Sequence, residues 1–309
     1  MYCGRHLTGT SLMKPCCGMP TASVALGVRV NKWSNKRVLK ARLISAAIMV
    51  PLVVYGVLFL SNPVFALLLA VIFLLAAWEW SHLIPVTSTV LRVIYTLVIA
   101  ALLGLLWQAG LAQSIQPLLL VAFVWWLGAL FWLSRPQLCA QVSPLNINIK
   151  MLAGALVLVP AWAALTTLHA SGDNGPKLTL MLLVLVWLAD SGAYFVGRQW
   201  GKSKLAPAIS PGKTWEGVYG GLLSSLLFAA VVGGLYSHSF RWTLMFMLVA
   251  AVTVLFSVAG DLLESLMKRH SGIKDSGNII PGHGGIFDRI DGLVAAAPMF
   301  LIGFLWLGL

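Results

Sequence analysis

The feature that most constrains this chain is a series of long apolar stretches. Nine runs of mostly apolar residues recur along its 309 residues, and a helix needs about 20 such residues to cross a bilayer. The mean hydropathy of +0.90 lies outside the range of ordinary soluble domains. Because the runs have no polar face, a large soluble helical protein is disfavoured. We predict an all-α, polytopic integral membrane bundle with about nine transmembrane helices. The predicted spans are 43–60, 63–81, 91–108, 115–133, 151–168, 178–196, 218–236, 242–260 and 292–309.

The basic residues predict the orientation of these spans. Cytoplasmic loops of membrane proteins are enriched in Lys and Arg. If the N-terminus is inside and the chain crosses nine times, 19 of the 21 basic residues fall inside, and only Lys177 and Arg241 fall outside. We therefore expect a cytoplasmic N-terminus, an outside C-terminus and a bacterial-type cytoplasmic (inner) membrane. The net charge of +12 follows from the same bias, so we expect no nucleic-acid partner.

The acidic residues are distributed unevenly along the chain. Seven of the nine acids follow residue 189, so we expect a transmembrane scaffold over 38–170 and a catalytic transmembrane region over 171–309. Residues 1–37 form a basic arm, which is either disordered or lies upstream of the true start. Among the early acids, Glu79 lies in "AAWEWSHL". It belongs either to an interfacial aromatic belt or to the interior of the bundle.

The first polar constellation is the predicted cytoplasmic loop 197–217 with the residues just before it. Asp190 ends an apolar run, and an ionisable residue at membrane depth is a functional candidate. Glycines and lysines follow in "GRQWGKSKLAPAISPGKTWEG". Glycine backbone amides and a lysine such as Lys213 suit a phosphate group, although the spacing is not that of a P-loop. The alternative is a solvated loop that only obeys the positive-inside rule.

The second constellation is "GDLLESLMKRHSGIKD", residues 260–275. On a helix, Asp261, Ser265 and Lys268 lie on one face. Glu264 and Lys268 are four residues apart and can pair. A helix-end salt bridge would explain that pair, but it would not explain an acid at 261 that ends the apolar run 242–260. A carboxylate in that position needs a partner such as a cation.

The third constellation lies in the predicted cytoplasmic loop 265–291. The segment "PGHGG", residues 281–285, is typical of a turn, and a helix is expected to begin near Ile286. Asp288 and Asp291 are then one turn apart, with Arg289 rotated away from them. Two carboxylates at a helix N-terminus behind a glycine-rich loop suit Mg²⁺ with a bound phosphate. His283 is either an acid–base group or a residue whose hydrogen bond orders the loop.

These segments resemble a known family. "SLMKRHSGIKDSGNIIPGHGGIFDRID", residues 265–291, is similar to the signature of the CDP-diacylglycerol synthase family, also called phosphatidate cytidylyltransferase. "ADSGAYFVGRQWGKSKLAPAISPGKTWEG", residues 189–217, resembles the loop that precedes this signature in the family. A weaker resemblance extends from about Val38 to the C-terminus.

The resemblance implies a reaction and a set of residues for it. The reaction is CTP + phosphatidate → CDP-diacylglycerol + pyrophosphate, with one or two Mg²⁺ ions required and a homodimer as the assembly. The implied metal ligands are Asp261, Asp288 and Asp291, which together with Lys268 form the implied catalytic set. The implied substrate-binding residues are Ser210, Lys213, Ser265, Arg269, His283, Gly284, Gly285 and Arg289, with Asp190 and Glu216 as further contacts.

Two other functions remain open from the sequence. Related CTP-dependent lipid or polyprenol kinases share part of the C-terminal pattern, but they would transfer the γ-phosphate to an alcohol and release CDP instead of pyrophosphate. An ion transporter could use Asp190 and Asp261 along a transmembrane path. The absence of a visible internal repeat and the glycine-rich loop disfavour the transporter.

Overall fold

The structure is a computed structural model that describes residues 47–85, 88–236, 239–273, 276–277 and 284–306. The predicted N-terminal arm over 1–37 and the predicted site residue His283 therefore lie outside the described residues.

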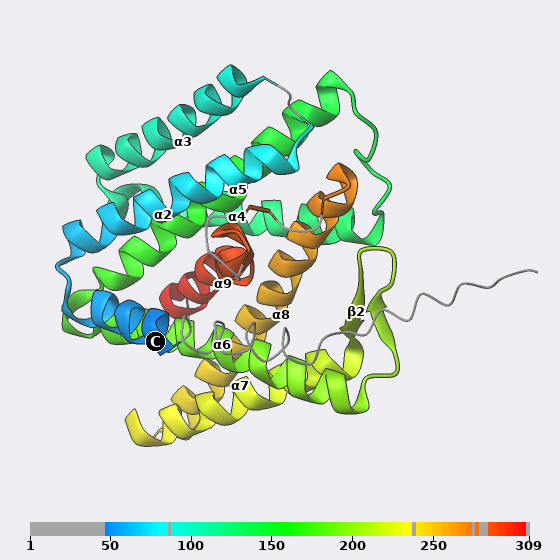
Figure 1. Cartoon of the computed structure of the whole chain (residues 1–309). Helices are drawn as coiled ribbons and strands as arrows, with labels where there is room; N and C mark the ends of the chain where they lie inside the picture. Colours follow the sequence, from blue (N-terminus) through cyan, green and yellow to red (C-terminus); the bar gives the residue numbers. More distant parts are fainter. Residues whose placement is uncertain (1–46, 86–87, 237–238, 274–275, 278–283, 307–309) are drawn as a thin grey trace, which may run out of the picture.

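The described residues form a helical bundle (Figure 1). A helix Ala47–Phe59 comes first. The long helices that follow are α2 (Asn62–Leu83), α3 (Thr89–Ala109), α4 (Leu111–Ser134), α5 (Pro144–His169), α6 (Gly175–Trp200), α7 (Trp215–Tyr236), α8 (Phe240–Ser271) and α9 (Phe287–Trp306), with a 3-10 turn η1 (Gly172–Asn174) before α6. Within the described ranges, seven helices are long and apolar enough to cross a membrane. The predicted all-α membrane fold is confirmed, whereas the count of nine spans and the sides of the termini stay predictions.

Local signals explain where several helices begin and end. The serine side chains of Ser88, Ser143 and Ser239 accept hydrogen bonds from the first amides of α3, α5 and α8. These amides have no partner within their own helix, so a side-chain cap stabilises the first turn. At the other end of α8, Gly272 adopts a left-handed conformation with φ 68°, which glycine tolerates without steric cost.

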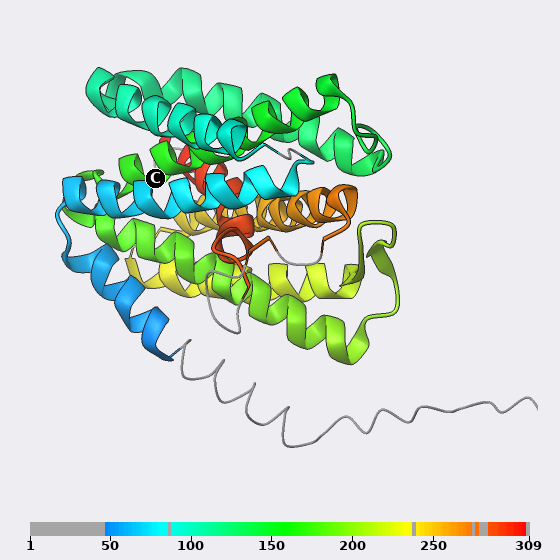
Figure 2. The same ribbon diagram turned by 45° about the horizontal axis from the view of Figure 1, so that its top comes forward.

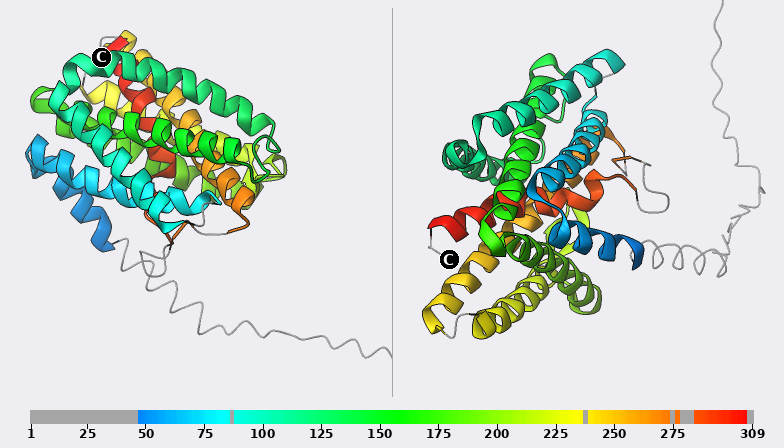
Figure 3. Two further views of the ribbon diagram at one scale, coloured as in Figure 1. Left: turned by 90° about the horizontal axis from the view of Figure 1, so that it is seen from above. Right: turned by 90° about the vertical axis from the view of Figure 1, so that its left-hand side faces the viewer.

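The last helix lies in the middle of the bundle. Figure 3 shows α9 enclosed by other helices, and it packs against α8, α5, α6, α4 and α2. Residues 294–302 of α9 are all buried. The lipid-facing candidates are instead the exposed apolar side chains of helices such as α3 and α7. The polar N-terminus of α9, with Asp288 and Asp291, therefore begins inside the molecule rather than on its surface.

The segment predicted as the loop 197–217 contains a small sheet. Strand β1 (Lys204–Ala206) pairs antiparallel with β2 (Ser210–Thr214), with Lys204 opposite Thr214 and Ala206 opposite Ser210. The helices also extend further into both predicted loops, because α6 ends at Trp200 and α8 ends at Ser271. The connection after α6 is therefore a short hairpin, which can place Lys213 more firmly than a flexible loop.

Four connections lie at one end of the bundle. The turn from α2 to α3, the connection from α4 to α5, the β1–β2 hairpin and the C-terminal end of α8 share one side in Figures 1 and 2. In the sequence-based topology, these four segments lie on the inside. The two segments with the chemical motifs are thus brought to the same end of the molecule.

Candidate functional site

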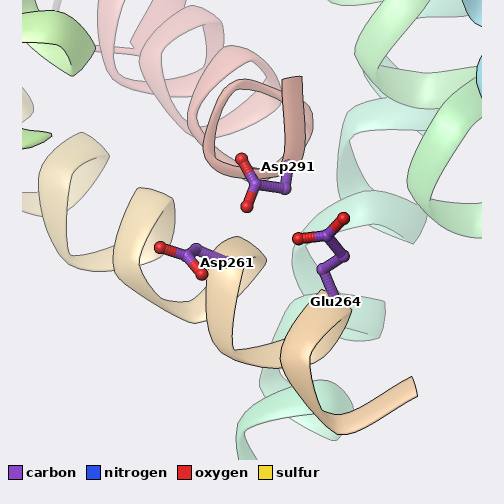
Figure 4. Close-up of side chains that lie close together, drawn as sticks. All are labelled: Asp261, Glu264 and Asp291. Carbon is purple, nitrogen blue, oxygen red and sulfur yellow. The ribbon is translucent and has the colours of Figure 1, made fainter. Parts of the chain in front are cut away.

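Three carboxylates meet where α8 passes the start of α9. Asp261 and Glu264 project from α8, and Asp291 projects from α9 toward them (Figure 4). One oxygen from each residue lies within 4.8 Å of the others. Carboxylates repel one another at such distances unless cations compensate their charge. The cluster therefore requires positive charge nearby.

Glu264 supplies the strongest sign that this cluster takes a cation. The residue is 3% exposed, and among the described residues its Oε1 atom has no hydrogen-bond partner. A buried polar atom without a partner is costly, so native structures usually give it one, or an ion. Oxygen-only ligands suit a hard divalent cation. Asp261, Glu264 and Asp291 are thus the residues that could hold a metal here.

Glycines allow α8 and α9 to approach closely beside the acids. A methyl group at Gly260 would collide with the backbone carbonyl of Asp291, and one at Gly292 would collide with the hydroxyl of Ser257. Side chains at these positions would push the helices apart. The two glycines therefore set the distance between Asp261 on α8 and Asp291 on α9.

Asp288 has a different environment from the three clustered acids. Its Oδ1 lies 2.7 Å from the ammonium of Lys268, which also lies 3.0 Å from Oε2 of Glu264. Its Oδ2 accepts a hydrogen bond from the amide of Gly285 at 2.8 Å. The preceding Gly284 has φ 83°, where most residues are strained. Asp288 thus connects the glycine turn to Lys268. Its spacing from Asp291 and the resemblance to the family both predict that it binds metal, and that role stays a prediction.

The hairpin completes the site from the opposite side. The ammonium of Lys213 on β2 lies 2.6 Å from Oδ2 of Asp261. Both residues line a cavity of about 420 Å³, which also includes Asp190 and Arg198 of α6. That volume falls within the range of small-molecule sites. Asp190 of α6, Lys213 of β2 and Asp261 of α8 therefore line one cavity.

Other predicted site residues hold the hairpin in position. Arg269 of α8 donates a hydrogen bond from Nε to the carbonyl of Ile209 at 3.0 Å. Both carboxylate oxygens of Glu216 accept from the amide of Ser203 at 3.1 Å. Arg269 therefore joins α8 to the hairpin, and Glu216 joins the hairpin to the start of α7.

The remaining predicted residues occupy nearby positions. Ser210 is the first residue of β2, Ser265 is half-buried on α8, and Arg289 is exposed on α9. Figure 4 labels the clustered acids Asp261, Glu264 and Asp291 alone.

Two residues that the sequence did not assign to the site belong to it. Glu264 was interpreted as a partner for Lys268, which is confirmed, but its second oxygen faces the acid cluster. For Glu79 the sequence allows either the membrane interface or the interior, and the structure buries it to 2% exposure beside the start of α9. The only sequence signal for Glu79 was an isolated acid in an apolar region.

The chain is similar to one family of enzymes. A family model described as the cytidylyltransferase family matches residues 40–306. The phosphatidate cytidylyltransferase of Pseudomonas aeruginosa is 42% identical over 85% of this chain and 95% of its own length. The proteins of the same name from Haemophilus influenzae and Thermotoga maritima are 40% and 34% identical, over 85% and 86% of this chain and 97% and 96% of their own lengths. This chain belongs to the cytidylyltransferase family.

Proposed function

We propose that this chain is a phosphatidate cytidylyltransferase, an enzyme of phospholipid biosynthesis that transfers a cytidylyl group from CTP to phosphatidate. The observation that carries the proposal is the cluster of Asp261, Glu264 and Asp291 with Lys213 and Lys268 beside it. It lies within a chain whose family match spans residues 40–306. The site combines anionic ligands for a cation with cations for phosphate groups.

The reaction forms one phosphorus–oxygen bond and breaks another. An oxygen of the phosphatidate phosphate attacks the α-phosphorus of CTP, and the bond to the β-phosphate oxygen breaks, so that pyrophosphate leaves. Both reactants are anions, so neutralising their charge and aligning them in line lowers the barrier. Lys213 on the hairpin and Lys268 on α8 are placed to do this from two sides of the cluster.

The donor set fits Mg²⁺. Carboxylate oxygens with substrate phosphates are its usual ligands in proteins, and the cluster supplies three carboxylates, one of which has an unpartnered oxygen among the described residues. Asp261, Glu264 and Asp291 would hold the ion, which supplies charge neutralisation at phosphate oxygens when it is bound. Asp288 would keep Lys268 oriented toward the substrates through its ion pair.

Binding of the nucleotide changes the partner of Lys213. Lys213 pairs with Asp261 and lines the cavity, so binding of a CTP phosphate by this lysine exchanges the carboxylate for the phosphate. Arg269 keeps the hairpin attached to α8 while this exchange takes place. We infer that the cavity beside Asp190 and Arg198 accepts the nucleotide, because the cationic side chains of Arg198 and Lys213 line it and can pair with phosphate groups.

The cellular arrangement follows from the same proposal. CTP is a cytosolic nucleotide and phosphatidate is a bilayer lipid, so the site should lie at the cytoplasmic surface of the inner membrane. The clustering of basic residues in the inside loops supports this side. The resemblance to the family supports a homodimer, and the mass of the purified protein in detergent would measure it.

The identity of the second product tests the reaction type. Purified protein would be incubated with CTP, phosphatidate and Mg²⁺, and soluble products would be separated by ion-exchange chromatography. Pyrophosphate in equal amount to the lipid product supports cytidylyl transfer. Release of CDP instead would show transfer of the γ-phosphate. The function would then be that of a CTP-dependent lipid kinase.

A further inference from the structure

A buried carboxylate from the first half of the chain contacts the start of α9. Glu79 lies on α2 and is 2% exposed. Its Oε1 accepts a hydrogen bond from the amide of Ile286 at 3.0 Å, and its Oε2 accepts one from the amide of Phe287 at 2.7 Å. The hydroxyl of Ser276 donates to Oε2 at 3.4 Å. These donors are 197 to 208 residues away from Glu79 in the sequence, and Ile286 and Phe287 lie directly before Asp288.

The backbone around Glu79 is shaped to fit its carboxylate. A methyl group at Gly277 or at Gly285 would collide with the carboxylate oxygens of Glu79. Two glycines from the same connection therefore lie against one acidic side chain. The neighbouring Trp80 packs edge-on against Phe287, with ring centroids 5.2 Å apart. The end of α2 thus holds the start of α9 through both polar and apolar contacts.

The position of these hydrogen bonds explains why an acid is needed. The first amides of a helix have no acceptor within that helix, and the N-terminus carries partial positive charge. A side chain of the capping residue normally fills this role. Here Glu79 supplies the acceptor from another helix, and its negative charge is favourable at the N-terminus of α9.

We propose that Glu79 is a positioning residue for the reaction at this site. It fixes the first turn of α9, so that Asp288 meets Lys268 and Asp291 meets the acids of α8. The first half of the chain is then part of the catalytic machinery as well as a scaffold. Only the activity measurement below rests on the proposed function, because the hydrogen bonds themselves can be measured without turnover.

The main test replaces Glu79 with an amide of nearly the same size. In Glu79→Gln, one acceptor oxygen becomes an NH₂ donor that faces a backbone N–H, so one buried amide loses its partner. We expect kcat to fall roughly 10- to 100-fold, the range that one unsatisfied buried donor would produce. The KM for CTP should stay close to that of the wild type, because Glu79 does not line the nucleotide cavity described above.

A matched control comes from the same turn of α2. Ser81 is also 2% exposed, but among the described residues its hydroxyl donates only to the carbonyl of Trp78 within α2, at 2.6 Å. Ser81→Ala should therefore leave kcat unchanged. Ser276→Ala should lower kcat by less than Glu79→Gln does. The double variant Glu79→Gln/Ser276→Ala should be little slower than Glu79→Gln, because both changes disrupt one contact.

Hydrogen exchange of peptides over residues 284–292, measured in detergent, separates positioning from general destabilisation. The amides of Ile286 and Phe287 should exchange faster in Glu79→Gln, whereas peptides from α3 and α4 should be unchanged. Wild-type kcat in Glu79→Gln would overturn the inference, as would a slower enzyme with unchanged exchange at 284–292 or with faster exchange throughout. If the wild-type protein forms no CDP-diacylglycerol, the proposed function fails, and the exchange comparison still tests the role of Glu79.

Discussion

At the residue scale, the four acids of the site lie in two different environments. Asp261, Glu264 and Asp291 face one another, whereas Asp288 binds Lys268 and the amide of Gly285. The sequence could predict that Asp261, Asp288 and Asp291 matter, because each follows an apolar run or a glycine turn. It could not assign Glu264, because the i, i+4 pair with Lys268 already explained that residue.

Removing the charge of Glu264 should weaken the binding of the cation. In Glu264→Gln the cluster loses one of its three carboxylates, so we expect the Mg²⁺ concentration for half-maximal activity to rise at least roughly 10-fold. A magnesium titration of the initial rate measures this. Asp173→Asn, at an exposed acid of the 3-10 turn η1, serves as the control. An unchanged magnesium requirement in Glu264→Gln would remove this residue from the proposed metal site.

The two hairpin lysines should differ in their effect on activity. Lys213→Ala removes the cation beside Asp261, and we expect kcat/KM for CTP to fall about 100-fold, since a hydrogen bond to a charged group contributes a few kcal/mol. Lys204, on the paired strand, is exposed, and Lys204→Ala should leave kcat/KM within a factor of about two. Equal losses in both variants would mean that the hairpin acts only through its total charge.

At the element scale, close packing of α8 against α9 positions the acidic side chains of the site. α8 has 32 residues and is therefore about 48 Å long, compared with about 30 Å for the hydrocarbon core of a bilayer. Its last turns can thus carry Glu264, Lys268 and Arg269 to the membrane surface. The length and hydropathy of the apolar runs predicted the helices well, because these two properties decide whether a helix can span a bilayer. The hairpin was missed because strands of three and five residues give no such signal.

Widening the contact between α8 and α9 should disrupt the site. In Gly260→Ala the added methyl group meets the carbonyl of Asp291, so we expect a loss of about 1–3 kcal/mol in stability. The melting temperature in detergent and the specific activity should both fall. Gly104→Ala in α3 is the control, because a methyl group there meets no atom within 4 Å. A fully active and equally stable Gly260→Ala would show that the spacing of the two helices is not limiting.

At the scale of the whole molecule, the arrangement brings distant segments to one end of the bundle. Glu79 and Phe287 are 208 residues apart, and no local pattern could have predicted their contact. The sequence-based prediction of the orientation used only the distribution of basic residues. The structure adds that four described segments predicted to be inside, the α2–α3 turn, the α4–α5 connection, the hairpin and the end of α8, lie at a common end (Figure 1).

The orientation can be tested with single cysteines. Starting from a variant whose four native cysteines are replaced by serine, Lys202→Cys and Asp173→Cys place thiols at opposite ends of α6. We expect a membrane-impermeant maleimide to label Asp173→Cys in intact spheroplasts and Lys202→Cys only after lysis. The reverse pattern would place the site outside, where CTP is not available.

The central claim is that the site transfers a cytidylyl group to a lipid phosphate. The most direct test gives the purified protein phosphatidate, Mg²⁺ and CTP labelled at the α-phosphate, and then measures the label in the extracted lipid. We predict that the label enters the lipid, that the same experiment with γ-labelled CTP leaves the lipid unlabelled, and that chelation of the metal abolishes transfer. Label in the lipid from γ-labelled CTP alone, or from neither nucleotide, would contradict this account.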